Sequence, residues 1–238
     1  MNDYFLSQNE ITELQNILLD WFRDNSRNFP WRKSSNPFHI LIAEKLLQQT
    51  FVGDKVVNAY LLIVTKYPNP KTLSNARIEE LHQIVAPLGL NYRAQEMINL
   101  ASAIDSQFSG NLPDEYKSLM KLPGVGEYIA RAVLSFGYNQ NIAIVDTNVA
   151  RVLFRVFGIG LPIPANPARK KYLIDLATSL IPEGKSREFN FAILDFSAKI
   201  CKPKNPACQI CPISRFCFYF MKSGFDNKPT REMLCNSK

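Results

Sequence analysis

Helical periodicity dominates the pattern of hydrophobic and polar positions along the chain. Apolar residues recur every three or four positions in eight segments, which we predict to be amphipathic helices. Gly, Pro and Asn cluster between these segments, where turns are expected. The best strand candidate, Ile142–Val145, is too short to seed a sheet, so the pattern predicts an all-α fold. The predicted helices are Ile11–Arg23, Phe38–Gln49, Asp54–Tyr67, Ile78–Pro87, Arg93–Phe108, Glu127–Phe136, Val149–Phe157 and Arg169–Ile181.

The same pattern argues against a membrane protein. Uninterrupted apolar stretches are short, as in Tyr60–Val64, and none is long enough to span a bilayer. The N-terminus is polar and acidic, without the basic and then apolar pattern of a signal peptide. We therefore expect a soluble cytoplasmic protein without a membrane partner. Its 238 residues suffice for one large domain or two small lobes, each with its own core.

Four of the five cysteines lie close together. Cys201, Cys208, Cys211 and Cys217 form a C-x6-C-x2-C-x5-C array, which in a reducing compartment indicates metal binding rather than disulfides. Four thiolates suit a tetrahedral zinc or an iron–sulfur cluster, and their spacing does not separate the two. Either metal would be structural, because four thiolates leave no open coordination position. Cys235, near the C-terminus, is expected to be free.

The positive charge of the chain is concentrated in its second part. Residues 1–140 carry 13 Lys and Arg against 14 Asp and Glu, whereas residues 141–238 carry 15 against 7. Such a distribution fits an ordinary solvated surface or a face that meets a polyanion. Several of these basic residues lie in or beside the cysteine array, where they would meet phosphates: Lys199, Lys202, Lys204 and Arg215.

A glycine-rich turn joins two predicted helical segments. In Leu122-Pro123-Gly124-Val125-Gly126 the proline ends the first segment, and the glycines permit a tight turn and close approach by another backbone. Amides at the start of the following helix would point outward and could bind a phosphate. A plain helix–helix turn is the alternative, although it needs at most one glycine.

Three motifs, taken together and in their order along the chain, resemble those of a known family. LPGVGEYIARAVLSF followed by IVDTNVARVL resembles the helix–hairpin–helix and Gly/Pro-rich loop with aspartate of the endonuclease III and MutY superfamily of DNA glycosylases. The cysteine spacing is similar to the [4Fe–4S] loop of that family. ILIAEKLLQQT resembles the early helix of its adenine-glycosylase and thymine-mismatch branches. The resemblance runs from about Phe29 to Phe220.

The resemblance implies a two-lobe, all-α enzyme that flips a base from double-stranded DNA and cuts its glycosidic bond. Residues 30–139 would form a six-helix barrel lobe with the helix–hairpin–helix. Residues 1–29 and 140–238 would form the [4Fe–4S] cluster lobe, and the two would flank a DNA-binding cleft. The protein is expected to be monomeric, and associated with the nucleoid if it is prokaryotic.

Asp146 is the first candidate catalytic residue. Cleavage of a glycosidic bond builds positive charge on the sugar, which a fixed carboxylate stabilises. An Asp before Thr147-Asn148-Val149 is also a good helix N-cap, and the two roles are compatible because a helix N-terminus favours negative charge. The resemblance places the catalytic aspartate of the family at Asp146.

Glu44 and Tyr128 are the other candidate catalytic residues. Glu44 falls on the apolar flank of its helix, where burial would raise the pKa of its carboxyl group and suit it to protonate a base. By the resemblance, Glu44 corresponds to the glutamate of the base pocket. Tyr128 borders the apolar face of its helix, as many structural tyrosines do. Lyase-competent members of the family have lysine there, adenine glycosylases usually serine, and the thymine-mismatch branch tyrosine.

Further positions are candidates for contacting DNA. Gln48 and Leu90 match the residues that penetrate the duplex and compensate for the extruded base. A solvated glutamine and a helix-end leucine are the structural alternatives. The hairpin would bind the DNA backbone through Gly124, Val125 and Gly126.

The base removed stays open between two branches of the family. Tyr128 favours thymine or uracil opposite guanine, with little or no AP lyase activity, because a lyase needs an amine at that position. Gln48 and Gln49 instead resemble the adenine branch, which acts on A·G or A·8-oxoG mispairs. Against adenine stand Leu90, where that branch usually has tyrosine, and a chain end at Lys238 that leaves no room for the C-terminal domain of adenine glycosylases. A non-catalytic iron–sulfur DNA-binding protein is the alternative of another class, although it would not require Asp146, Glu44 or Tyr128.

Overall fold

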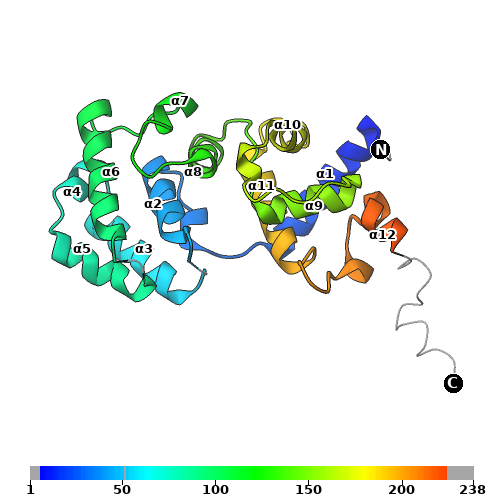
Figure 1. The fold of residues 1–238 in the computed structure, drawn as a ribbon, viewed down its shortest axis with the longest axis horizontal. Coiled ribbons are helices and arrows are strands. Elements are labelled where there is room, and N and C mark those ends of the chain that lie inside the picture. Colours follow the sequence, from blue (N-terminus) through cyan, green and yellow to red (C-terminus); the bar gives the residue numbers. More distant parts are fainter. Residues whose placement is uncertain (1–5, 51, 90, 224–238) are drawn as a thin grey trace, which may run out of the picture. The chain divides into compact units, whose positions relative to one another are not determined.

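The computed structural model describes residues 6–50, 52–89 and 91–223, and the regular secondary structure in these ranges consists of helices (Figure 1). Neither strand nor bridge occurs in this part of the chain, which confirms the all-α prediction. Leu90 and Cys235, two residues singled out in the sequence, lie outside the described residues. Among the helices described, none combines the length and the apolar character that crossing a bilayer requires.

The chain divides into two compact units. Unit 2 is the continuous segment 28–140, and unit 1 combines residues 1–27 with residues 141–238. The sequence had placed these boundaries at residues 30 and 139. Unit 1 thus joins the two ends of the chain, and each unit has its own set of helices.

Unit 2 is built around one central helix, α2 (Pro37–Leu47). The side chain of Asn36 caps this helix by accepting a hydrogen bond from the amide of Phe38 over 2.9 Å, and Pro37 occupies its first turn. Every residue from Ile40 to Leu46 is buried, because α3, α8 and a π-helical turn all pack against α2. The other elements are η1 (Pro30–Arg32), α3 (Asp54–Lys66), α4 (Pro70–Ser74), α5 (Ile78–Val85), η2 (Ala86–Leu88), α6 (Arg93–Phe108), α7 (Tyr116–Leu119), α8 (Glu127–Ala132) and the π-helical turn η3 (Val133–Gly137).

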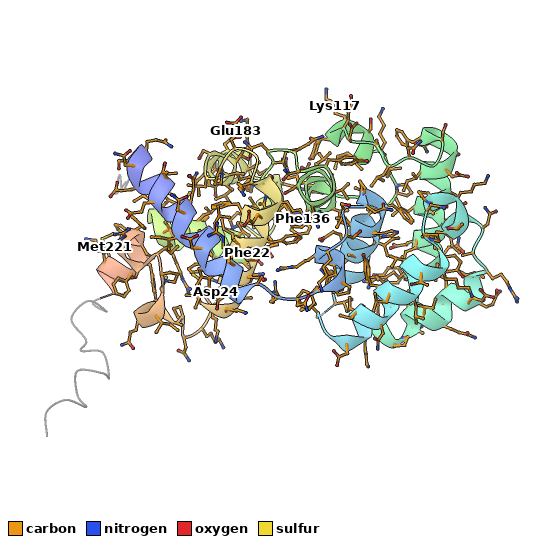
Figure 2. All side chains as sticks on the ribbon, turned by 180° about the vertical axis from the view of Figure 1, so that it is seen from behind. Phe22, Asp24, Lys117, Phe136, Glu183 and Met221 are labelled. Atoms are coloured by element: carbon orange, nitrogen blue, oxygen red, sulfur yellow. The ribbon has the colours of Figure 1, made fainter. Side chains whose placement is uncertain are left out.

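The π-helical turn fits closely against the start of α2. A Cβ atom on Gly137 would lie 3.0 Å from the backbone of Pro37, so a larger residue would push the two segments apart. Phe136, in the same turn, is buried among the helices of unit 2, whereas Lys117 points outward at its edge (Figure 2).

Unit 1 packs its N-terminal helix against a long C-terminal helix. In α1 (Gln8–Asn25), Trp21 meets Phe196 of α11 (Ser186–Lys199) edge to face, with ring centroids 5.7 Å apart. Just beyond α1, Arg27 forms an ion pair with the fully buried Asp195, which also accepts a hydrogen bond from the Arg27 amide over 2.8 Å. These contacts join the two chain ends. The remaining elements are α9 (Thr147–Phe157), η4 (Pro167–Arg169), α10 (Lys171–Ser179), η5 (Cys208–Ile210), η6 (Ser214–Phe216) and α12 (Phe218–Lys222).

Unit 1 differs from the sequence-based prediction in one long helix. Helix α11 was not predicted, because its buried positions surround the helix instead of forming one stripe and include Asn190 and Asp195. The segment Ile142–Val145 has no strand partner in the described structure, since its backbone binds side chains of α11. The backbone amide of Ile144 donates to Oδ1 of Asn190 over 3.0 Å. The side-chain amide of Asn190 donates to the carbonyl of Ile142 over 3.0 Å.

Candidate functional site

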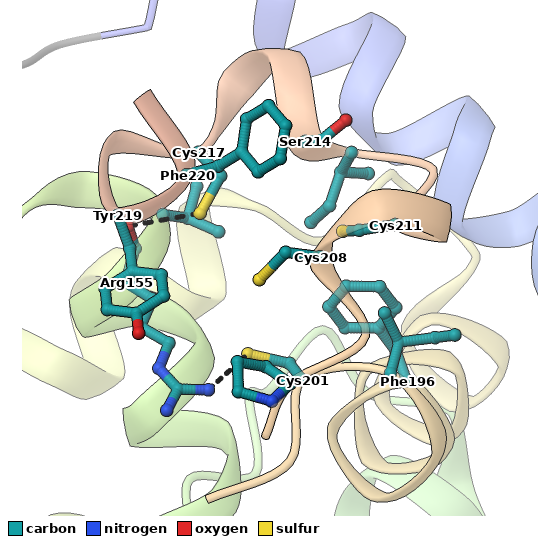
Figure 3. A pocket seen from close by; sticks show the side chains of 13 residues that line it. Arg155, Phe196, Cys201, Cys208, Cys211, Ser214, Cys217, Tyr219 and Phe220 are labelled. Atoms are coloured by element: carbon teal, nitrogen blue, oxygen red, sulfur yellow. Dashed lines mark hydrogen bonds between the residues drawn. The ribbon is translucent and has the colours of Figure 1, made fainter. Parts of the chain in front are cut away.

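The four clustered cysteines line one pocket of unit 1. Cys201 follows α11, Cys208 begins η5, Cys211 directly follows η5, and Cys217 precedes α12. All four line the same pocket together with apolar side chains such as Phe196 (Figure 3). Within residues 6–50, 52–89 and 91–223, no group of three or more His, Cys, Asp or Glu side chains is arranged as a metal-ion site. A donor set made only of thiols in an apolar shell fits an iron–sulfur cluster.

Burial changes the chemistry of these thiols. It raises the pKa of Cys211 to about 12 and also raises the pKa of Cys208 and of Cys217, so the metal-free thiols stay protonated at neutral pH. Arg155 of α9 lies beside the pocket and donates to Sγ of Cys201 over 3.4 Å (Figure 3). Its guanidinium also lies over the ring of Tyr219, 4.9 Å from the centroid. A cation therefore stands next to the position of one thiolate ligand.

Asp146 is the N-cap of α9. Its Oδ1 accepts hydrogen bonds from the amides of Asn148 and Val149, over 2.8 and 2.7 Å, and its Oδ2 accepts from the side-chain amide of Asn148 over 2.9 Å. The predicted cap is therefore present. Three donors hold the carboxylate in one orientation, which a catalytic charge stabiliser also requires.

A continuous chain of hydrogen bonds leads from Asp146 to the cysteine pocket. Oδ1 of Asn148 accepts from Arg151 over 3.0 Å, and Arg151 donates in turn to the carbonyl of Cys201 over 2.9 Å. Arg151 also donates to the carbonyl of Ser197 over 3.1 Å, at the end of α11. Burial lowers the pKa of the Arg151 guanidinium, but an arginine remains charged. The orientation of Asp146 thus depends on groups anchored beside the first cysteine.

Glu44 and Tyr128 both belong to unit 2. Glu44 lies on the buried helix α2 and is 7% exposed, so the apolar flank inferred from the sequence is part of a helix buried on all sides. Tyr128 is half-buried in the first turn of α8, which packs against α2. At the start of α8, Glu127 forms an ion pair with Arg131 over 3.4 Å and accepts a hydrogen bond from the Tyr116 hydroxyl. This network fixes the turn that presents Tyr128.

The three hairpin residues Gly124, Val125 and Gly126 differ in their exposure to solvent. Gly124 has a φ of +70°, which favours glycine, and a Cβ atom there would lie 2.8 Å from Nζ of Lys45. Val125 is buried, and its amide donates to the carbonyl of Leu122 over 3.2 Å, so its side chain serves the core. Gly126, the N-cap of α8, is exposed with open space around its missing side chain. The hairpin can therefore offer its backbone at Gly124 and Gly126.

Gln48 lies at the C-cap of α2 and is exposed. It lines an open pocket with Gln49, Lys45 and Gly124, so the structure brings Gln48 and the hairpin to one place within unit 2. The side chains of Gln48 and Gln49 are both available on the surface of this unit.

Sequence reasoning missed the residues that position the candidates. Asn148 and Arg151 follow Asp146 at helical spacing, so a search for polar partners along α9 could have found them. Asn190 fixes the backbone before Asp146 from a distant helix, and no local signal in the sequence points to that contact.

Comparison with known proteins identifies the family. Residues 42–171 match the model of the HhH-GPD superfamily of base excision DNA repair proteins, and residues 201–217 match the iron–sulfur binding domain of endonuclease III. A thymine/uracil-DNA glycosylase of Methanothermobacter thermautotrophicus is 37% identical over 87% of this chain and 92% of its own length. An adenine DNA glycosylase of Buchnera aphidicola is 34% identical over 89% of this chain and 58% of its own length. The solved structure of a thermostable thymine-DNA glycosylase, also 34% identical, superposes with a TM-score of 0.83 over 90% of this chain and 98% of the other.

The chain therefore belongs to the HhH-GPD superfamily of base excision DNA repair proteins. It is a DNA glycosylase that binds DNA, and its four clustered cysteines bind an iron–sulfur cluster, which decides between the two metals that spacing left open. The four cysteine thiolates would hold this cluster, which would cross-link residues 201–217.

Proposed function

We propose that this protein is a monofunctional glycosylase that removes thymine or uracil opposite guanine, and that it acts as a monomer. The likeness to the thymine/uracil-DNA glycosylase of Methanothermobacter thermautotrophicus carries the choice of base. Tyr128 supports it, because a tyrosine at this position of α8 is larger than the serine usual in the adenine branch and would narrow the pocket to a smaller pyrimidine, against which it can stack or donate a hydrogen bond. Mispaired thymine is also easier to extrude than paired thymine.

Asp146 would stabilise the sugar as the glycosidic bond breaks. The bond from C1′ to the base nitrogen lengthens first, which leaves positive charge on the sugar ring, and a water molecule then adds to C1′. A carboxylate held by three donors cannot turn away from that charge. Preorganised charge of this kind is commonly the largest contribution to catalysis.

Glu44 would supply a proton to the departing base. Its position on the buried helix α2, where it is 7% exposed, excludes most water from the side chain. Gln48 would enter the duplex from the end of the same helix and compensate for the extruded base. The exposed backbone at Gly124 and Gly126 would bind a phosphate of the DNA.

An adenine glycosylase is the second candidate, favoured by Gln48 and Gln49 and by the adenine-specific relative. Single-turnover reactions on duplexes with T·G, U·G, A·G and A·8-oxoG pairs, followed by alkaline cleavage of abasic sites, separate the two. We expect T·G and U·G to be processed faster, and faster release of adenine would replace our proposal with the second candidate.

Two variants of Tyr128 sharpen this experiment. Tyr128→Phe keeps the ring but removes the hydroxyl group, whereas Tyr128→Ser removes both. If stacking positions the base, Tyr128→Phe retains thymine release and Tyr128→Ser loses it, with DNA affinity nearly unchanged in both. Sedimentation of the free protein and of its DNA complex tests the monomer, and a dimer in either would overturn that part.

A further inference from the structure

Two cations are buried at the C-terminal end of α2, and catalysis as proposed uses neither. Arg93, the first residue of α6, and Lys45, on α2, are each 2% exposed. Burying a charge is costly unless it is well partnered. The partners of these two residues therefore show what their burial achieves.

Arg93 binds the turn that follows α2. It donates to the carbonyl of Leu46 over 2.9 Å, to Oγ1 of Thr50 over 3.1 Å and to the carbonyl of Gln48. The last carbonyls of a helix have no partner within the helix and attract a cation. Arg93 thus binds carbonyl groups at the C-terminal end of α2. It also contacts Gln48 and Thr50, the two neighbours of Gln49 in the chain.

Gln49 has a conformation that needs such support. Its φ is +53°, a region that residues other than glycine rarely adopt. A strained backbone conformation of this kind persists only where surrounding contacts hold it in place, and such conformations are concentrated at functional sites. By contacting Gln48 and Thr50, Arg93 holds the backbone in place on both sides of the strained residue Gln49.

Lys45 binds the hairpin in a similar way. Its Nζ donates to the carbonyl of Gly124 over 3.3 Å and pairs with Oε2 of Glu96 over 3.4 Å. Glu96 belongs to the first turn of α6, the helix that Arg93 begins. One ammonium group therefore joins α2, α6 and the hairpin.

We propose that Arg93 and Lys45 form a two-cation clamp that positions the Gln48–Thr50 turn and the Gly124 hairpin for DNA. The inference rests on the proposed function, in which Gln48 enters the duplex and the hairpin binds a phosphate. Both are positioning residues. Both line the open pocket beside Gln48, but each is 2% exposed and already bound within the protein, so little of either cation is left for a phosphate.

Hydrogen exchange in the free protein tests the clamp without any activity. The Thr50 amide, bonded to the carbonyl of Leu47 over 3.3 Å, reports on the turn. The Val125 amide, bonded to the carbonyl of Leu122, reports on the hairpin. We expect Arg93→Lys to speed exchange at Thr50 at least tenfold, and Lys45→Met to do the same at Val125. Arg77→Met, which removes an exposed charge from the same unit, should change neither amide.

A second measurement follows the consequence on DNA. Arg93→Lys should slow single-turnover base release at least tenfold, while the salt dependence of DNA binding stays that of the wild type. Because lysine keeps the positive charge, the slope is also measured in Arg93→Met: a salt slope reduced there by about one phosphate contact would make Arg93 a DNA ligand and overturn the clamp. If the wild type releases neither thymine nor uracil, the proposed function fails, but the exchange measurement still decides the clamp.

A milder variant covers the case in which Arg93→Lys does not fold. Thr50→Val keeps the shape of the side chain and removes one acceptor of Arg93, together with the bond that the hydroxyl donates to the Gln48 carbonyl over 3.1 Å. Exchange at the Gln49 and Thr50 amides should therefore rise about threefold. Unchanged exchange in Thr50→Val, or in a folded Arg93→Lys, would overturn the proposal.

Discussion

Asn148 donates its side-chain amide to Oδ2 of Asp146 over 2.9 Å, while its own Oδ1 accepts from Arg151 over 3.0 Å. The amide has one workable orientation, because the reverse would set its NH2 group against the guanidinium. The carboxylate of Asp146 is therefore oriented by a side chain that Arg151 holds in place, and Arg151 is bound to the carbonyl of Cys201.

Asn148→Ala should slow base release about tenfold and lower the stability by about 1 kcal/mol. The substitution leaves Asp146 its two backbone donors but frees Oδ2, and it removes a partner of the buried Arg151. Single-turnover rates and thermal unfolding measure the two effects. Thr147→Ala, at the exposed neighbouring position, is the control and should change neither. If folded Asn148→Ala keeps the wild-type rate, the contact between Asn148 and Asp146 does not contribute to base release.

Asp146→Asn should abolish base release while DNA binding survives. An asparagine can still cap α9 through its oxygen, but its NH2 group would face the side-chain NH2 of Asn148, so the stability should fall by about 1 kcal/mol. Loss of one aligned stabilising charge typically costs on the order of a hundredfold or more in rate. A variant that binds DNA and retains near-normal single-turnover rates would make Asp146 a structural cap alone.

The sequence predicted the fold better than it predicted the contacts around Asp146. Helices with one apolar stripe, such as α1, could be read directly, whereas α11 could not, because it is buried on several sides and carries a buried Asp195. The role of Asp146 as N-cap of α9 followed from local pattern. Its link to Cys201 joins residues far apart in the chain, and no periodicity encodes such a contact.

Wild-type protein should not cleave the strand, whereas Tyr128→Lys should gain a covalent complex with DNA. A lyase needs an amine that attacks C1′ of the sugar and forms a Schiff base. The first turn of α8 would place a lysine where lyase-competent members of the family carry theirs. Borohydride trapping on a T·G duplex measures the complex, with Tyr128→Phe as the control. A good yield of trapped complex from the wild type would contradict the monofunctional assignment.

Loss of the iron–sulfur cluster should become easier as the pH falls. Iron binds thiolates, and burial raises the pKa of Cys211 to about 12 in the metal-free protein. Protons therefore compete strongly with iron, so cluster uptake releases protons and is favoured at higher pH. With a chelator present, the broad visible absorbance should fade faster at about pH 6 than at about pH 8. Equal rates would contradict this reasoning.

Cys208→Ser should reduce solubility and DNA affinity before it affects the chemical step. Cys208 is one of four ligands, and Asp146 does not line the cysteine pocket, so the loss of Cys208 should loosen residues 201–217 first. Iron content, DNA affinity and the single-turnover rate at saturating protein separate these effects. A slowed chemical step with normal affinity would instead point to control of Asp146 through Arg151.

DNA binding should weaken steeply with salt, and the basic residues of the cysteine loop should contribute unequally. Lys202 and Lys204 are exposed beside the cysteine pocket, whereas Arg215 already forms an ion pair with Glu13. Each lysine that meets a phosphate adds about 0.9 to the slope of log affinity against log salt concentration. We therefore expect a double Lys202→Ala, Lys204→Ala variant to flatten the slope by up to about 1.8, and Arg215→Ala to flatten it less. Titrations of an undamaged duplex at several salt concentrations measure both. An unchanged slope in the double variant would show that this loop does not contact DNA. If Arg215→Ala flattened the slope more than the double variant, DNA would displace Glu13 from Arg215 on binding.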